Sequence, residues 1–175
     1  MGLVFRARDE ELQRVVALKF LVPDLEIDVE PLIALLRQEA RTIAQLNHEN
    51  IVRIFDVSEW SPPHSSNKVP FLIMECLEGE SLSTLLDRER LSLKHALDIM
   101  NAIASGLAHA HARHVIHRDL KPDNVIIRTD ARGQHTAVLL DFGLSWHAHQ
   151  PDLLAEELRS AVGSPVWMAP EQIGR

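Results

Sequence analysis

The first seventy residues alternate apolar and polar side chains over short segments, which is the pattern of half-buried strands. Four segments carry this pattern, and they are residues 3–8, 15–21, 51–57 and 69–74. Between the second and third of them, apolar residues recur at helical spacing over residues 30–46, with Asp28 as a candidate N-cap. The loop 61–67 joins the last two strands and is rich in Pro and Ser. This part of the chain therefore predicts a small sheet with one helix.

From residue 81 onward the pattern becomes that of helices. Ser81 and Ser92 are candidate N-caps of two helices, a short one to Asp87 and a long one to about Arg113. One set of apolar positions is predicted to form the buried side of the long helix, and its members are Leu93, Leu97, Met100, Ile103, Ala104 and Leu107. Two short strands are predicted after this helix, at residues 125–127 and 137–140.

The composition is that of an ordinary globular domain. Among 175 residues, 46% are hydrophobic and 25% are charged, which argues against a disordered chain. The net charge is −7 and no basic stripe is present, so no nucleic-acid partner is expected. No apolar run is long enough to cross a membrane. The sole cysteine, Cys76, cannot form an internal disulfide, which favours a reducing cytosol.

The ten histidines raise the question of a metal site. His109 and His111 lie on different faces of the predicted long helix, because residues two apart do not share a face. His147 and His149 lie in a polar segment without a nearby cysteine. These side chains are interpreted as solvated or capping histidines, and a structural zinc site is the less favoured alternative.

The most informative segment is His-Arg-Asp-Leu-Lys-Pro-Asp-Asn at residues 117–124, followed by Asp-Phe-Gly at 141–143. A Val-Ala-Leu-Lys segment ending at Lys19 precedes it, and an Ala-Pro-Glu segment ending at Glu171 follows it. This is the order of groups that phosphoryl transfer from a metal–ATP complex requires. A capped turn would also favour Asp, Asn and Pro, but it does not explain the full order.

On these motifs the chain resembles eukaryotic-type Ser/Thr protein kinases, and most closely their bacterial branch. The resemblance implies an α+β, bilobal fold with a β-rich N-lobe at 1–74, a hinge at 75–80 and a helical C-lobe at 81–175. Only the last glycine of the family's glycine-rich loop is matched, by Gly2. The C-lobe is also expected to be incomplete, since the chain ends just after the Ala-Pro-Glu motif. The resemblance therefore implies a partial kinase domain, in which the apolar side of the long helix would face water.

The resemblance also implies how ATP is held. Lys19 would contact the α- and β-phosphates, Glu39 would orient Lys19, and the backbone at Gly2 would approach the phosphates. Alternation along the strand places Ala17 on the same face as Lys19. Taken singly, a lysine at a strand edge and a solvated helix glutamate remain simpler interpretations of Lys19 and Glu39.

Four polar residues are implied to act on the transferred group and the metal. Asp119 would be the catalytic base that accepts or orients the hydroxyl proton of the substrate. Lys121 would offset the charge of the γ-phosphate, and a lysine here resembles the Ser/Thr-specific form of the loop. Asn124 and Asp141 offer the hard oxygen ligands that Mg²⁺ prefers. The implied cofactors are thus ATP and Mg²⁺.

Adenine would lie between Val4 and Ala17 on one side and Ile126 on the other. Backbone groups of Glu75 and Leu77 would bond to its edge. For these apolar residues, a place in the ordinary core is an alternative that is true in part.

Other matched residues are interpreted as packing. His117 and Phe142 would join Ile43 and Ile54 in an apolar stack, and Met74 would limit the depth of the adenine pocket.

Residues 141–171 match an activation segment, in which Ser164 could bridge Asp119 and Lys121. Arg118 could pair with a phosphate on this segment, and Ser160 is the candidate for phosphorylation. An unmodified loop serine is an equally good interpretation of Ser160.

The expected activity is transfer of the γ-phosphoryl group of Mg–ATP to Ser and Thr hydroxyls of proteins, in bacterial signalling. The alternative is a catalytically incompetent fragment that acts at most as a nucleotide-binding or interaction module. A small-molecule phosphotransferase is disfavoured, because residues 163–171 match a peptide-docking segment that such enzymes lack. The expected location is cytoplasmic, with the full-length protein able to be tethered to a membrane.

Overall fold

A computed structural model of the chain describes residues 3–20, 40–63, 68–130, 134–142 and 167. The chain divides into two compact units. The first unit comprises Met1–Asn47 and Val52–Glu78, and the second comprises His48–Ile51 and Gly79–Arg175. None of the helices in these described ranges is both long enough and apolar enough to span a membrane.

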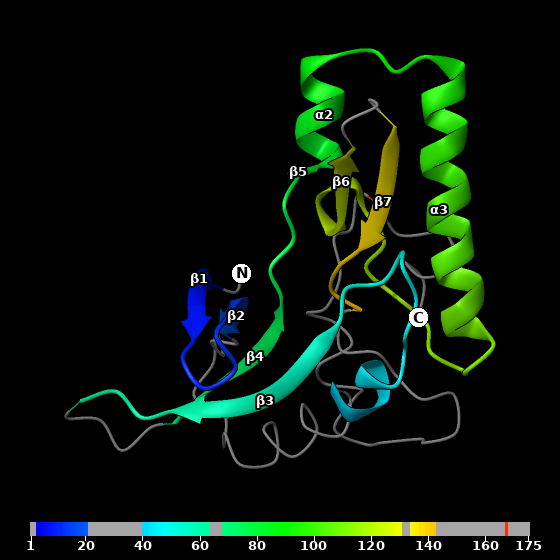
Figure 1. Ribbon diagram of the computed structural model, residues 1–175. Coiled ribbons are helices and arrows are strands. Elements are labelled where there is room, and N and C mark those ends of the chain that lie inside the picture. Colours follow the sequence, from blue (N-terminus) through cyan, green and yellow to red (C-terminus); the bar gives the residue numbers. More distant parts are fainter. Residues whose placement is uncertain (1–2, 21–39, 64–67, 131–133, 143–166, 168–175) are drawn as a thin grey trace. The chain divides into compact units, whose positions relative to one another are not determined.

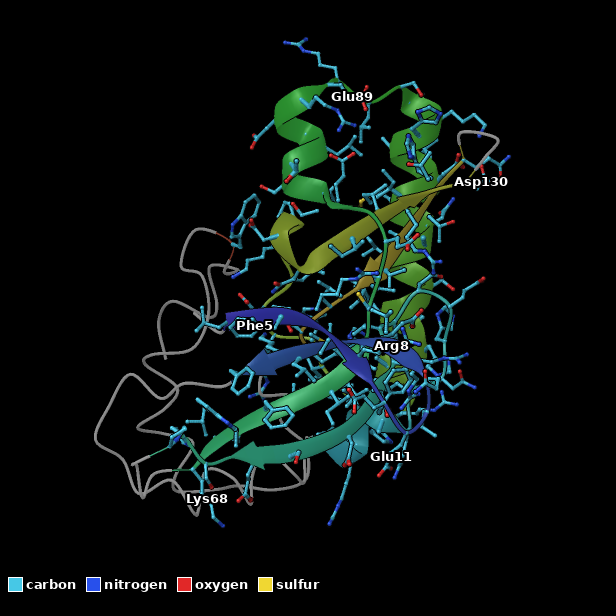
Figure 2. The ribbon with its side chains drawn as sticks, turned by 60° about the vertical axis from the view of Figure 1, so that its left-hand side comes forward. Phe5, Arg8, Glu11, Lys68, Glu89 and Asp130 are labelled. Carbon is cyan, nitrogen blue, oxygen red and sulfur yellow. The ribbon has the colours of Figure 1, made fainter. Side chains whose placement is uncertain are left out.

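The first unit contains an antiparallel sheet of four strands in the order β1-β2-β4-β3 (Figure 1). The strands are β1 (Leu3–Asp9), β2 (Arg14–Phe20), β3 (Ile54–Trp60) and β4 (Val69–Glu75). Three of the predicted strands are confirmed within one residue at each end, whereas β3 begins and ends three residues later than expected. In the β1–β2 turn, where Figure 2 labels Glu11, Asp9 accepts the Leu12 N–H at 3.0 Å. Of the helix predicted at 30–46, the described residues 40–44 are helical.

An aromatic row crosses all four strands on one face of this sheet. Phe20 packs edge-on against Phe5 and Trp60, with ring centroids 5.6 and 5.9 Å apart, and lies 5.0 Å from the ring of Phe71. Phe5, labelled in Figure 2, comes from the outer strand β1. Aromatic cross-strand pairs of this kind stabilise a sheet and fix its register.

The second unit places two helices beside an antiparallel sheet of three strands in the order β5-β6-β7 (Figure 1). Its elements are β5 (Glu80–Ser81), α2 (Leu82–Arg88), α3 (Leu93–His111), the 3₁₀ helix η1 (Pro122–Asn124), β6 (Val125–Thr129) and β7 (His135–Leu139). Both predicted N-caps are confirmed. The Ser81 hydroxyl accepts the Thr84 N–H at 3.1 Å, and the Ser92 hydroxyl accepts the His95 N–H at 3.2 Å.

The predicted buried side of α3 is wrong in part. Leu93, Leu97 and Met100 are 76%, 54% and 60% exposed, and Ala104 is exposed as well. The buried residues are instead Ile99, Ile103, Gly106 and Ala110, which recur at helical spacing on the side that packs against β7. The helix carries two apolar stripes, and Gly106 lies on the buried one. A Cβ at Gly106 would lie 2.9 Å from Leu139 Cδ1 and 3.0 Å from the Asn50 carbonyl oxygen, so glycine favours this close approach.

The segment His48–Ile51 belongs to the second unit although the residues on both sides of it belong to the first. Ile51 forms a parallel bridge with Leu139 at the end of β7. The Leu139 N–H donates to the Asn50 carbonyl at 2.9 Å, and the Asn50 side-chain amide donates to the Ala137 carbonyl at 2.8 Å. This docking explains why β3 starts at Ile54 and not at residue 51 as predicted.

Candidate active site

In the first unit, the strand register gathers several predicted nucleotide-binding residues on one face of the sheet. Val4 pairs with Lys19, and Ala17 pairs with Met74. Residues opposite each other share a face, as do residues two apart on one strand. Val4, Ala17, Lys19 and Met74 therefore face the same side. Lys19 is half-buried and Val4 is exposed.

At the end of β4 the chain leaves the sheet through Glu75. The Glu75 N–H donates to the Arg53 carbonyl at 2.9 Å. A ligand at this point would therefore meet the Glu75 carbonyl and not its N–H. Leu77 follows in a stretch without regular structure, so its backbone is not part of a helix or strand.

In the second unit, a short loop before η1 holds the carboxylate of Asp119 from two sides. Lys121 Nζ lies 2.9 Å from Asp119 Oδ2. The Asn124 side-chain amide donates to the same oxygen at 2.9 Å and to the Asp119 carbonyl at 2.8 Å. The turn is tight because Arg118 takes a left-handed φ of 63° and the Asp119 N–H donates to the His117 carbonyl. Two residues predicted from the sequence, Lys121 and Asn124, are thus each in direct contact with the predicted Asp119.

The backbone of Leu140 places the next residue, Asp141, beside the same loop. Its N–H donates to the Asn124 carbonyl at 2.8 Å, and its carbonyl accepts from His117 Nε2 at 2.8 Å. Asp141 follows with a left-handed φ of 45°. The main chains at Asn124 and Asp141 are therefore neighbours.

The donor set of Asn124 and Asp141 fits a hard cation. The Asn124 amide nitrogen is turned to Asp119, so its oxygen points away from that carboxylate. An amide oxygen and a carboxylate are ligands that suit Mg²⁺. In the part of the chain that is described, no group of three or more His, Cys, Asp or Glu side chains could hold a metal. Nucleotide phosphates and water would have to complete the coordination shell.

His117 packs against Phe142, which is one part of the predicted apolar stack. Its ring is 2% exposed and its centroid lies 4.7 Å from that of Phe142. Because Nε2 faces a carbonyl oxygen, Nε2 carries the proton, while Nδ1 is buried without a partner among the described residues. Burial lowers the pKa of His117, which keeps the ring neutral.

Several predicted residues lie outside the described ranges. These are Gly2, Glu39, Ser160, Ser164 and the Ala-Pro-Glu motif ending at Glu171. The sequence analysis in turn missed His48 and Asn50, which dock the segment His48–Ile51 onto β7 and α3 within the second unit. A polar residue just before the apolar pair at 51–52 is typical of a loop, so nothing in the pattern marked Asn50 as buried.

Comparison with known proteins agrees with these motifs. Residues 1–175 match the family model described as protein kinase domain. Similar proteins include serine/threonine-protein kinase PknA of Mycobacterium tuberculosis, 36% identical over 173 residues, and Pkn1 of Myxococcus xanthus, 37% identical over 179 residues. PrkC of Bacillus subtilis is 35% identical over 173 residues. The matches cover 98%, 100% and 98% of this chain but only 38%, 24% and 25% of these relatives.

Proposed function

The chain belongs to the protein kinase family, and from this premise we propose that it transfers the γ-phosphoryl group of Mg–ATP to Ser and Thr hydroxyls of proteins in bacterial signalling. The observation that carries the proposal is the contact of Asp119 with both Lys121 and Asn124. The names of the relatives, which are serine/threonine-protein kinases, support the same acceptor class.

The loop residues divide the chemistry between them. Asp119 accepts or orients the proton of the acceptor hydroxyl, and the ammonium of Lys121 offsets charge on the transferred group. Asn124 holds the Asp119 carboxylate in one orientation through its amide, which lowers the cost of ordering it for reaction. Asn124 and Asp141 would supply oxygen ligands to Mg²⁺, which when bound would neutralise phosphate charge.

The remaining predicted residues form the proposed nucleotide site. Val4, Ala17 and Ile126 would contact adenine. The Glu75 carbonyl and the Leu77 N–H would bond to its edge. Three further residues would act on the phosphates, with Lys19 in contact, Glu39 orienting Lys19, and Gly2 at the close approach of the backbone.

The domain organisation is likewise a proposal, with an N-lobe at 1–74, a hinge at 75–80 and a partial C-lobe at 81–175. The division of the chain after Glu78 supports it. The partner is a protein with a Ser or Thr acceptor, and the net charge of −7 gives no reason to propose a nucleic acid. The cytosol remains the proposed location because Cys76 is a free thiol.

The test is radiolabel transfer from ATP to a generic protein substrate by the full-length protein. Asp119→Asn and Lys19→Met should each lower the rate by at least about a hundredfold. Asp98→Asn is the matched control, since Asp98 is an exposed carboxylate of α3 paired with Lys94 at 2.8 Å, and it should leave the rate unchanged. Near-normal transfer in either site variant would refute the assigned roles. Nucleotide binding by the unmodified protein without any transfer would support the non-catalytic alternative.

A further inference from the structure

A pair of histidines packs where the segment His48–Ile51 meets α3. The ring centroids of His48 and His109 lie 4.8 Å apart. His48 Nε2 lies 3.3 Å from the Ser105 hydroxyl on α3. From the sequence, His109 is interpreted as solvated or capping; the residue is half-buried, and its Nε2 atom is buried without a partner among the described residues.

The neighbours of each ring determine where its proton lies. The Asn50 N–H donates to His48 Nδ1 at 3.1 Å, so this nitrogen is unprotonated and Nε2 carries the hydrogen. Arg113 Nη1, which can only donate, lies 3.4 Å from His109 Nδ1. His109 therefore also carries its single hydrogen on Nε2. Both rings are neutral in this arrangement.

A proton added to His109 has no favourable place. It would enter at Nδ1 and face the guanidinium of Arg113. The resulting cation would also lie against the ring of His48. Burial lowers the pKa of His109, and the charge of Arg113 lowers it further.

The groups around His109 come from two elements. Its own helix supplies Arg113, and the docked segment supplies His48. The segment His48–Ile51 contacts β7 through backbone groups of Ala137 and Leu139. Within the described ranges, no carboxylate is among the charged groups that act on His109.

We propose that protonation of His109 releases the segment His48–Ile51 from α3 and β7. The attachment of this segment to α3 and β7, called the anchor below, is therefore a pH-sensitive element of the second unit. The neutral pair stabilises the anchor at neutral pH. Because the pKa of His109 is lower in the folded protein than its ordinary value of 6.5, the stabilisation is lost as pH falls below that value.

The anchor leads to the proposed catalytic residues within the same unit. Asn50 holds Leu139, and the next residue, Leu140, is bonded to Asn124 and His117 just before Asp141. Loosening the segment would therefore disturb the backbone that carries Asp141. This consequence for phosphoryl transfer rests on the proposed function, whereas the pH-sensitive anchoring does not.

Hydrogen exchange of the Leu139 amide tests the anchor, because that N–H donates to Asn50. In the full-length protein, protection of this amide should fall progressively between about pH 7.5 and about pH 5.5, after correction for intrinsic exchange. His109→Phe keeps an aromatic ring and the bond from Arg113 to the residue 109 carbonyl, and it should remove most of the fall. His95→Phe is the matched control, since His95 lies on the same helix and its ring packs 4.7 Å from His135, away from the segment.

An equal loss of protection in the parent protein and in His109→Phe would overturn the proposal, as would a flat response in the parent. A second measurement needs no variant. Nitrogen-15 spectra of the imidazoles should show both His48 and His109 protonated on Nε2 at about pH 7.5. His109 titrating at or above its ordinary pKa of 6.5 would equally refute the proposal.

Discussion

Replacing Asn50 by Ala should destabilise the protein through a single lost hydrogen bond. Asn50 is 4% exposed, and its amide donates to the Ala137 carbonyl at 2.8 Å. Ala137 is itself fully buried, so its carbonyl would lose this bond in a place that water does not reach. A buried polar group left without a partner costs about 1–3 kcal/mol. The backbone bonds of residue 50 to Leu139 and His48 do not depend on the side chain and should persist.

Urea denaturation of the purified protein, followed by circular dichroism, measures the change. The free energy of unfolding should fall by about 1–3 kcal/mol, which lowers Tm by about 2–4 °C for each kcal/mol. Asn47→Ala is the matched control, because Asn47 accepts from Arg53 at 3.3 Å in an exposed position. Its effect should stay within about 0.5 kcal/mol.

Two outcomes would refute this reasoning. The first is an equal effect of Asn50→Ala and Asn47→Ala. The second concerns Asn50→Asp, which preserves the size of the side chain but removes the donor and turns a carboxylate toward the Ala137 carbonyl. This variant should cost at least as much as the alanine. A stable aspartate variant would mean that the donated bond does not hold the segment in place.

Three further predictions follow from the structure. Gly79→Ala should lower the free energy of unfolding by about 1–3 kcal/mol in the same urea assay, because Gly79 has a φ of +152° and its Cβ would meet the Ile127 carbonyl; an unchanged midpoint would contradict this. Stability should fall as pH decreases below 6.5, since burial lowers the pKa of His117 and the unfolded chain binds more protons. His117→Phe should reduce the slope and leave the part that is due to His109, and an undiminished slope between about pH 7.5 and about pH 5.5 would argue against this. Asp141→Asn should raise the Mg²⁺ concentration needed for ATP turnover, and activity that is unchanged across a magnesium titration would exclude Asp141 as a ligand.

Local features of the fold were predictable from sequence because their causes are local. Ser81 and Ser92 cap helices through N–H groups three residues away. The buried face of α3 was not predictable from periodicity, because the helix has apolar residues on two sides. The choice depends on the absence of a side chain at Gly106 and on Leu139, which lies on a different element.

The same distinction applies to the candidate site. Asp119, Lys121 and Asn124 lie within six residues, so their spacing nearly implies their contacts. The contacts of Asn50 and His48 span 87 and 57 residues of sequence. Such contacts depend on the tertiary fold. An Asn or a His in a loop does not by itself indicate a contact of this kind. The tautomers of His48 and His109 depend on donors from the backbone and from Arg113, which no sequence pattern reveals.

The docking of His48–Ile51 means that one cut cannot separate the two units. A fragment starting at Gly79 would contain α3 and β7 but would lack Asn50 and Ile51, which complete the edge of β7. A fragment ending at Glu78 would retain both residues without the strand that they bind. The chain must therefore close a long loop before β7 is fully paired, and contacts of such sequence separation slow folding. Two such fragments should reconstitute each other by complementation, with the four-residue segment supplied in trans.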